Sequence, residues 1–133
     1  MKHLLIPIIF MIFSWSSCRK PAEPPTLTSV LISKEWKVSV ARDFGVNYTP
    51  FYNGMKFTFT GDGKVKINDG TTVHNGTWSE NANDGTFFMD IASPSFQFDF
   101  ISQQWKVVTA SLTGINLVDD EINTTQELRF SVY

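Results

Sequence analysis

Cys18, the one cysteine of this 133-residue sequence, is the first side chain whose surroundings point to chemistry. It follows an unbroken apolar run over residues 4–13, and Ser16 and Ser17 stand directly before it. As a helix, that run would reach about 15 Å, roughly half of the hydrocarbon core of a bilayer, so it is too short for a stable span. A basic start, a short apolar run and small residues after it are typical of a secretory signal peptide. We therefore expect residues 1–17 to be a signal peptide.

The Ser-Ser-Cys junction resembles the lipobox of bacterial lipoproteins, with Trp15 standing where that motif usually has an aliphatic residue. The resemblance implies cleavage before Cys18, a diacylglycerol on its sulfur and often a further acyl chain, such as palmitate, on the new amino group. The alternative is an ordinary secretory signal that leaves a free thiol. Residues 18–26 contain three of the six prolines, which predicts an extended tether of roughly 25 Å. Arg19 is not the Asp that holds some lipoproteins in inner membranes, which by resemblance favours the outer membrane.

Few other residues could carry out catalysis or bind a metal. Without residues 1–17, His74 is the one histidine, so a Ser-His pair or a His-rich metal site is not expected. That part of the chain has 10 basic and 13 acidic residues, a formal net charge of −3, and no basic block, which argues against a nucleic-acid partner. The acidic cluster at 119–121 is interpreted as a solvated hairpin tip in preference to a weak calcium contact. We expect no catalytic residue, no metal and no cofactor, and a protein that is not an enzyme.

Three candidates for contact with a small ligand lie in expected strands: Arg42, His74 and Trp78. His74 shares its parity with Trp78, so both should face the inside of a barrel, with His74 near one mouth, where it could orient a ligand. The alternative for His74 is a strand end, half in water. Arg42 continues the apolar parity of the strand over 35–42, and from inside the barrel it could pair with a ligand carboxylate. Alternatively, the strand simply leaves the core at Arg42.

Two further candidates, Tyr48 and Tyr52, belong to the segment 43–54, which has four aromatic residues and no strand pattern. The segment either covers a barrel mouth or presents a contact surface, or it plugs one end of the barrel as core. The plug is favoured, because small barrels are commonly filled by side chains.

The elements that must position these residues follow from alternating hydrophobicity. From residue 35 onward, apolar and polar residues alternate in short runs, which is typical of strands with one buried face. Asp-Gly pairs between the runs suit the positive φ angles of tight hairpin turns. A short helix is expected over 27–33, capped by Thr26 or Thr28. The nine expected strands lie near residues 35–42, 55–60, 64–68, 72–79, 86–92, 95–101, 104–110, 113–118 and 126–132.

These runs, evenly spaced and joined by tight turns, predict an all-β fold: a small antiparallel up-and-down β-barrel of about eight or nine strands with a short N-terminal helix. Closure would remove the exposed edges that so many aromatic strands would otherwise present. Trp36, Trp78 and Trp105 are expected in the core, each on the apolar parity of its strand. The expected organisation is a signal peptide at 1–17, a lipidated cysteine and tether at 18–26, and one barrel domain at 27–133.

The order of several short motifs resembles the lipocalin-like domains of Bacteroidota lipoproteins over about residues 27–133. The resemblance is carried by Trp36-Lys37-Val38 after the short helix, Phe57-Thr58-Phe59 with Asp62-Gly63-Lys64-Val65, Gly76-Thr77-Trp78, Trp105-Lys106-Val107 with Ile115 and Leu117, and the closing Leu128 and Phe130. It implies an up-and-down barrel of about eight strands that can enclose an apolar cavity.

The leading hypothesis is a lipid-anchored protein of the bacterial envelope, held at the outer membrane, that binds a small apolar or amphipathic ligand in its barrel without catalysis. The alternative is a protein-contact module, such as a periplasmic hydrolase inhibitor or an accessory subunit of an outer-membrane assembly. The volume inside the barrel separates the two, because an apolar cavity favours the first and a filled interior favours the second.

Overall fold

The computed structural model describes residues 23–122 and 125–133. The predicted signal peptide and the lipidation at Cys18 lie outside the described residues. Among the described residues, no helix combines the length and the apolar character that crossing a bilayer requires.

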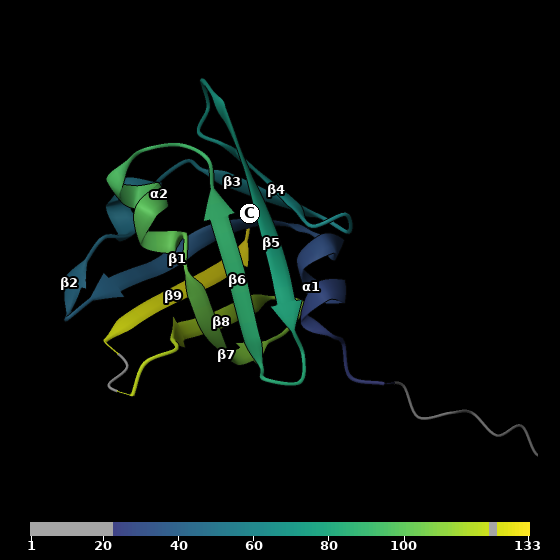
Figure 1. Ribbon diagram of the computed structural model, residues 1–133. Coiled ribbons are helices and arrows are strands. Elements are labelled where there is room, and N and C mark those ends of the chain that lie inside the picture. Colours follow the sequence, from purple (N-terminus) through teal and green to yellow (C-terminus); the bar gives the residue numbers. More distant parts are fainter. Residues whose placement is uncertain (1–22, 123–124) are drawn as a thin grey trace, which may run out of the picture.

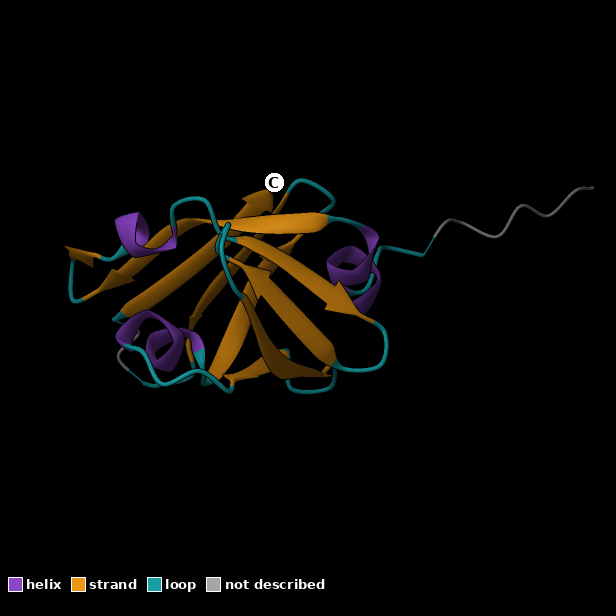
Figure 2. Cartoon of the chain, turned by 90° about the horizontal axis from the view of Figure 1, so that it is seen from above, coloured by secondary structure: helices purple, strands orange, loops and turns teal. Residues whose placement is uncertain are grey.

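The chain forms a closed antiparallel β-barrel of eight strands with one additional strand, as the alternation predicted (Figures 1 and 2). Each strand from β3 onward pairs with the next, and β9 pairs with β1 to close the barrel. The two-residue strand β2 pairs with Arg42 and Asp43, the last two residues of β1. The strands are β1 Glu35–Asp43, β2 Val46–Asn47, β3 Lys56–Thr60, β4 Lys64–Asn68, β5 Val73–Asn81, β6 Thr86–Ile91, β7 Gln104–Ala110, β8 Gly114–Asp119 and β9 Gln126–Val132.

The predicted N-terminal helix is confirmed as α1 Leu27–Ser33. Its first turn is capped by Thr26, whose side chain accepts a hydrogen bond from the main-chain N–H of Ser29. One face of α1 is buried against the barrel, including Leu31. The Trp36 indole N–H donates to the carbonyl of Leu31 at 3.0 Å, which ties the end of α1 to the first strand. In Figures 1 and 2, α1 lies at one end of the molecule, opposite β2 and the second helix, α2 Phe96–Ile101.

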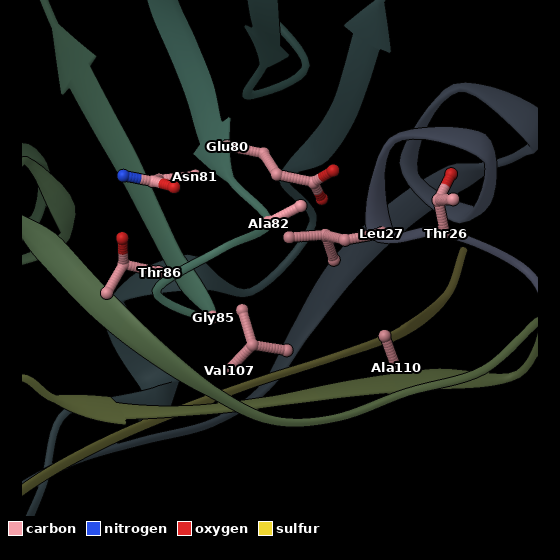
Figure 3. Close-up of a pocket in the computed structure, with 9 residues that line it drawn as sticks. All are labelled: Thr26, Leu27, Glu80, Asn81, Ala82, Gly85, Thr86, Val107 and Ala110. Atoms are coloured by element: carbon pink, nitrogen blue, oxygen red, sulfur yellow. The ribbon is translucent and has the colours of Figure 1, made fainter.

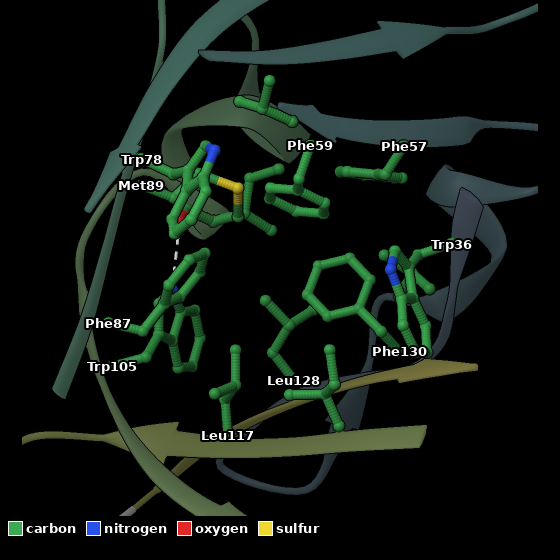
Figure 4. Close-up of a cluster of buried hydrophobic side chains, with 14 of the residues drawn as sticks. Trp36, Phe57, Phe59, Trp78, Phe87, Met89, Trp105, Leu117, Leu128 and Phe130 are labelled. Atoms are coloured by element: carbon green, nitrogen blue, oxygen red, sulfur yellow. Dashed lines mark hydrogen bonds between the residues drawn. The ribbon is translucent and has the colours of Figure 1, made fainter. Parts of the chain in front are cut away.

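The barrel interior is filled by side chains. All three expected tryptophans, Trp36, Trp78 and Trp105, are buried in one continuous core with aromatic and aliphatic residues from every long strand (Figure 4). The Trp105 indole N–H donates to the carbonyl of Ile101, so its polar atom is satisfied. A narrow crevice under α1 has no room for a water molecule; it is lined by Leu27, Leu31, Phe87, Ile115, Leu117 and Phe130. This end of the interior is therefore packed rather than hollow.

The strand predicted over 95–101 is wrong: these residues form the helix α2 Phe96–Ile101. Six alternating residues are too few to distinguish a strand from a helix turn by periodicity. Pro94 lacks an N–H for a sheet ladder, and the carbonyl of Ser95 accepts from the main-chain N–H of Asp99, which closes a helical turn. In the helix, Phe98 and Ile101 share one face and are buried.

The segment 43–54, for which no strand was expected, contains both β2 and the short 3-10 helix η1 Thr49–Tyr52. The number of strands therefore remains nine, with β2 in place of the strand predicted over 95–101.

Candidate functional site

Arg42 does not point into the barrel, and the prediction that it lies inside is wrong. The pairing of β1 with β9 shifts register between Val38 and Val40, which is a β-bulge. A bulge inserts one residue and reverses the alternation of every side chain that follows. Ala41 is therefore fully buried, and Arg42 is exposed to solvent. The guanidinium of Arg42 cannot meet a ligand inside the barrel.

His74 lies on the inward side of β5, as predicted, but its ring is already occupied by contacts within the protein. Its Nε2 atom lies 2.9 Å from Oδ2 of Asp69, and its ring packs against the Phe98 ring at 4.5 Å between centroids. Oδ1 of Asp69 accepts from the main-chain N–H groups of Thr71 and Thr72. The hydrogen bond from His74 and these main-chain bonds hold the pKa of Asp69 well below its usual range. The pair fastens the β4–β5 turn to α2.

Trp78 is buried, and its indole N–H is shared between two main-chain carbonyls of the β3–β4 hairpin. It donates to the carbonyl of Thr60 at 3.1 Å and to that of Lys64 at 3.0 Å. Since both bonds hold the hairpin closed, Trp78 stabilises the fold, and its indole N–H has no free capacity to bind a ligand.

Tyr52 and Tyr48 lie in the segment that closes the barrel end opposite α1. The Tyr52 side chain is buried, and its hydroxyl donates to the carbonyl of Gln97 in α2 at 2.6 Å. Burial raises the pKa of the Tyr52 phenol. The Tyr48 ring packs against Phe100 of α2 at 5.6 Å between centroids. The segment 43–54 and α2 together plug this end of the barrel.

The outer side of the plug exposes aromatic rings. Phe51 of η1 and Phe96 of α2 are 55% and 53% exposed, and their centroids are 5.9 Å apart. Tyr48 contacts both, at 6.3 Å and 5.1 Å between centroids. We call Tyr48, Phe51 and Phe96 the aromatic patch. Sequence reasoning missed Phe96, because it lay in the segment interpreted as a strand.

Phe44 lies at the tip of the β1–β2 hairpin, four residues before Tyr48. The hairpin loop has two residues, Phe44 and Gly45, and both have positive φ angles, 47° and 80°. This is the pattern of a type I′ turn, in which asparagine, aspartate or glycine is strongly preferred at the first position. Phe44 is the one non-glycine residue with positive φ in the described part of the chain. Its ring is 80% exposed, so contacts within the domain do not offset the strain.

A groove of about 230 Å³ lies at the other end of the barrel, beside α1 (Figure 3). The ladder between β6 and β7 ends at Thr86 and Lys106, and one further main-chain hydrogen bond joins Val107 to Gly85. Thr26 and Leu27, at the start of α1, form part of the groove wall. The groove is lined by Thr26, Leu27, Glu80, Asn81, Ala82, Gly85, Thr86, Val107 and Ala110.

The acidic cluster at 119–121 was expected to be a solvated hairpin tip, but the structure buries one of its carboxylates. Asp119 is buried, and its carboxylate accepts from the main-chain N–H groups of Thr125 and Gln126. Asp120 is exposed and accepts from the Gln104 amide. Within the described residues, no group of acidic, histidine or cysteine side chains is arranged to hold a metal ion.

The fold and these sites define a lipocalin-like β-barrel with a filled interior, an aromatic patch at one end and a groove at the other. No protein-family model and no curated protein matches the sequence. Two of the solved structures that share the fold are both from Bacteroides. One is a DUF4847 family protein from Bacteroides vulgatus, with 12% identity and a TM-score of 0.60 over 80% of this chain and 96% of that chain. The other is a lipocalin-like protein from Bacteroides uniformis, with 13% identity and a TM-score of 0.55 over 77% of this chain and 98% of that chain.

At this identity, the two likenesses show the fold alone. A lipocalin-like barrel is a fold that can bind ligands, and the identity of any ligand or partner must come from the surfaces described above.

Proposed function

We propose that this chain is a binding protein of the bacterial envelope, anchored at the outer membrane through Cys18, that contacts a protein partner through its aromatic end. The observation that carries the proposal is the strained, exposed Phe44, which stands four residues before Tyr48 of the aromatic patch. We call Phe44 and the aromatic patch together the aromatic end. Backbone strain of this kind is concentrated at binding and switch sites, where it is part of the function.

The size of the exposed aromatic surface supports a protein partner. A phenylalanine side chain presents on the order of 200 Å², so Phe44, Phe51 and Phe96 together expose roughly 400 Å². A standard protein interface buries about 800 Å² on each partner, with an apolar centre and a polar rim. The aromatic end would supply that centre. The Tyr52–Gln97 hydrogen bond ties η1 to α2, the two parts of the plug that carry Phe51 and Phe96.

The position of the proposed anchor favours a protein partner over the membrane itself. The described chain enters the domain at α1, on the side opposite α2, the helix that carries Phe96 (Figure 1). Cys18 precedes Glu23 by five residues, so the anchor lies at most about 18 Å from Glu23. With the anchor near α1, the aromatic end would lie on the far side of the domain from the point of attachment, where a protein partner has access to it.

Photo-crosslinking in intact cells tests the proposed contact. We would introduce benzoylphenylalanine singly at Phe44, Phe51 and Phe96, with Phe88 as the control. Phe88 is 43% exposed on the outer wall of β6, so it matches the others in type and accessibility. The expected result is one adduct of the same mass from the three aromatic-end positions and none from Phe88. Absence of an adduct, or equal labelling from Phe88, would contradict the proposal.

A second candidate function is the binding of a small apolar or amphipathic ligand. The lipocalin-like fold and the groove beside α1 favour it. Because the interior under α1 is packed, the groove replaces the barrel centre as the place for such a ligand.

A further inference from the structure

The groove beside α1 has an apolar lining with a single charge. Leu27, Val107 and Ala110 supply much of its apolar surface, and Glu80 is the one charged residue among those that line it. In Figure 3, these side chains come from α1, β7 and β5 and surround the same space. A site of this composition distinguishes ligands by the charge of their polar end.

Glu80 is unusual because it continues the inward parity of Trp78 on β5. It is paired across the ladder with Phe87, which is buried. Glu80 is half-buried, so its carboxylate keeps part of its contact with water, and an ammonium group beside it would add a charge-assisted hydrogen bond. Its Oε1 atom accepts from the Thr28 hydroxyl at 3.2 Å. Within the described part of the chain, no lysine, arginine or histidine lies within 4 Å of the Glu80 carboxylate.

The groove has room for a short chain but not for a long one. An apolar cavity of about 150 Å³ is enough for benzene, so a groove of this volume would accommodate an alkyl chain of roughly six to nine carbons. Leu27 lines both the groove and the packed crevice below it, and its side chain forms the wall between them. A longer chain would meet Leu27 or extend into solvent.

We propose that this groove binds small cationic amphiphiles, with the alkyl chain on Leu27, Val107 and Ala110 and the ammonium group on the Glu80 carboxylate. The inference deepens the second candidate function and is independent of the aromatic end. The charge of this head group is opposite to that of the carboxylate that the sequence suggested as a ligand group for Arg42.

Calorimetric titration of residues 23–133 tests this, because they contain the whole barrel and every residue that lines the groove. They lack both the apolar run and Cys18, so no detergent is needed that would compete for the groove. The ligands are alkylamines of four to twelve carbons, with the alcohols and carboxylates of equal length. For the amines, affinity should rise about two- to fourfold with each methylene and level off near eight carbons. Octylamine should bind about fivefold more tightly than octanol, because its hydrogen bond to Glu80 is charge-assisted, and octanoate should bind most weakly.

Two variants and one control separate the contribution of the ligand's head group to affinity from that of its alkyl chain. Glu80→Gln should abolish the preference for octylamine over octanol and leave octanol binding unchanged. Ala110→Leu, which fills the groove, should weaken all three ligand classes. Glu121→Gln is the matched control, since Glu121 is exposed in the turn after β8, away from the groove, and should change nothing.

The outcomes distinguish failure of ligand binding in the groove from failure of the cationic specificity alone. If no ligand class binds, both the second candidate function and the cationic specificity fail. If octanol binds at a site that Ala110→Leu removes, but amines gain nothing from Glu80, the groove is a ligand site and the cationic specificity is wrong.

Discussion

Replacing Phe44 by asparagine should stabilise the domain and weaken its proposed protein contact. With φ at 47°, the main chain of Phe44 is in the left-handed region. That conformation costs an ordinary L residue about 1–2 kcal/mol, whereas asparagine adopts it more readily. The hydrogen bond from the main-chain N–H of Phe44 to the carbonyl of Thr125 does not depend on the side chain and is kept in the variant.

The loss of the phenyl ring should cost little. The ring is 80% exposed in the folded domain, and unfolded chains themselves bury roughly 10–40% of such surface. Folding therefore removes almost none of the ring from water, and the relief of backbone strain dominates. We expect Phe44→Asn to raise the free energy of unfolding by about 0.5–1.5 kcal/mol. For a domain of this size, that corresponds to a rise of roughly 3–8 °C in the melting temperature.

Thermal unfolding followed by circular dichroism measures the effect, with Phe44→Leu as the control. Leucine keeps an apolar side chain and the same backbone strain, so this variant should show no gain in melting temperature. In cells, Phe44→Asn should reduce crosslinking from benzoylphenylalanine at Phe51. A melting temperature that falls, or that rises equally in both variants, would refute the reasoning that strain at Phe44 is maintained for an external contact.

Four further predictions address the fold, its pH dependence and the anchor. Trp78→Ala should lower the free energy of unfolding by about 3–5 kcal/mol in a denaturant titration; a loss below about 1 kcal/mol would contradict its role in the core. Gly76→Ala should cost about 1–3 kcal/mol by overpacking, because a Cβ atom there would lie 2.5 Å from the carbonyl oxygen of Asp90; an unchanged urea midpoint would exclude the clash. Folding lowers the pKa of Asp69, mainly through the hydrogen bond from His74, so its stabilising contribution is present above the unfolded pKa of about 3.9 and is lost as pH falls through the folded value. The urea midpoint of the wild type should therefore fall more steeply below about pH 4 than that of Asp69→Asn, and parallel profiles would count against the pair. Labelled palmitate should enter the wild-type chain and not Cys18→Ser, and equal incorporation would exclude lipidation at that residue.

Local chemistry explains what could be predicted of the fold. The alternation of Phe57 and Phe59 with polar neighbours depends only on the two-residue period of a strand, and the hairpin turn at Gly63 depends only on the positive φ angle that glycine allows. The capping of α1 by Thr26 is equally local. Because these features lie within a few residues of one another, the all-β class, the helix at 27–33 and most strand positions follow from the sequence.

The inward position predicted for Arg42 and the strand predicted over 95–101 are wrong, because long-range contacts decide both. The parity of Arg42 depends on a bulge in the pairing of β1 with β9, and nothing near Arg42 in the sequence marks that bulge. The segment 96–101 alternates like a strand, yet it forms a helix whose Phe98 packs on His74 from a distant strand. For Glu80, the signal was present, since it continues the parity of Trp78, but its meaning depends on the groove.

By itself, the sequence determined the class of the protein: one small antiparallel barrel with an N-terminal helix and an aromatic core. Only the tertiary structure decided that the barrel interior is packed under α1, that Tyr48, Phe51 and Phe96 form one patch, and that Glu80 faces a groove beside Leu27. The physical reason is that hydrophobic periodicity records which face of an element is buried. The volume left inside the barrel and the partners of each polar atom depend on how side chains from distant strands fit together.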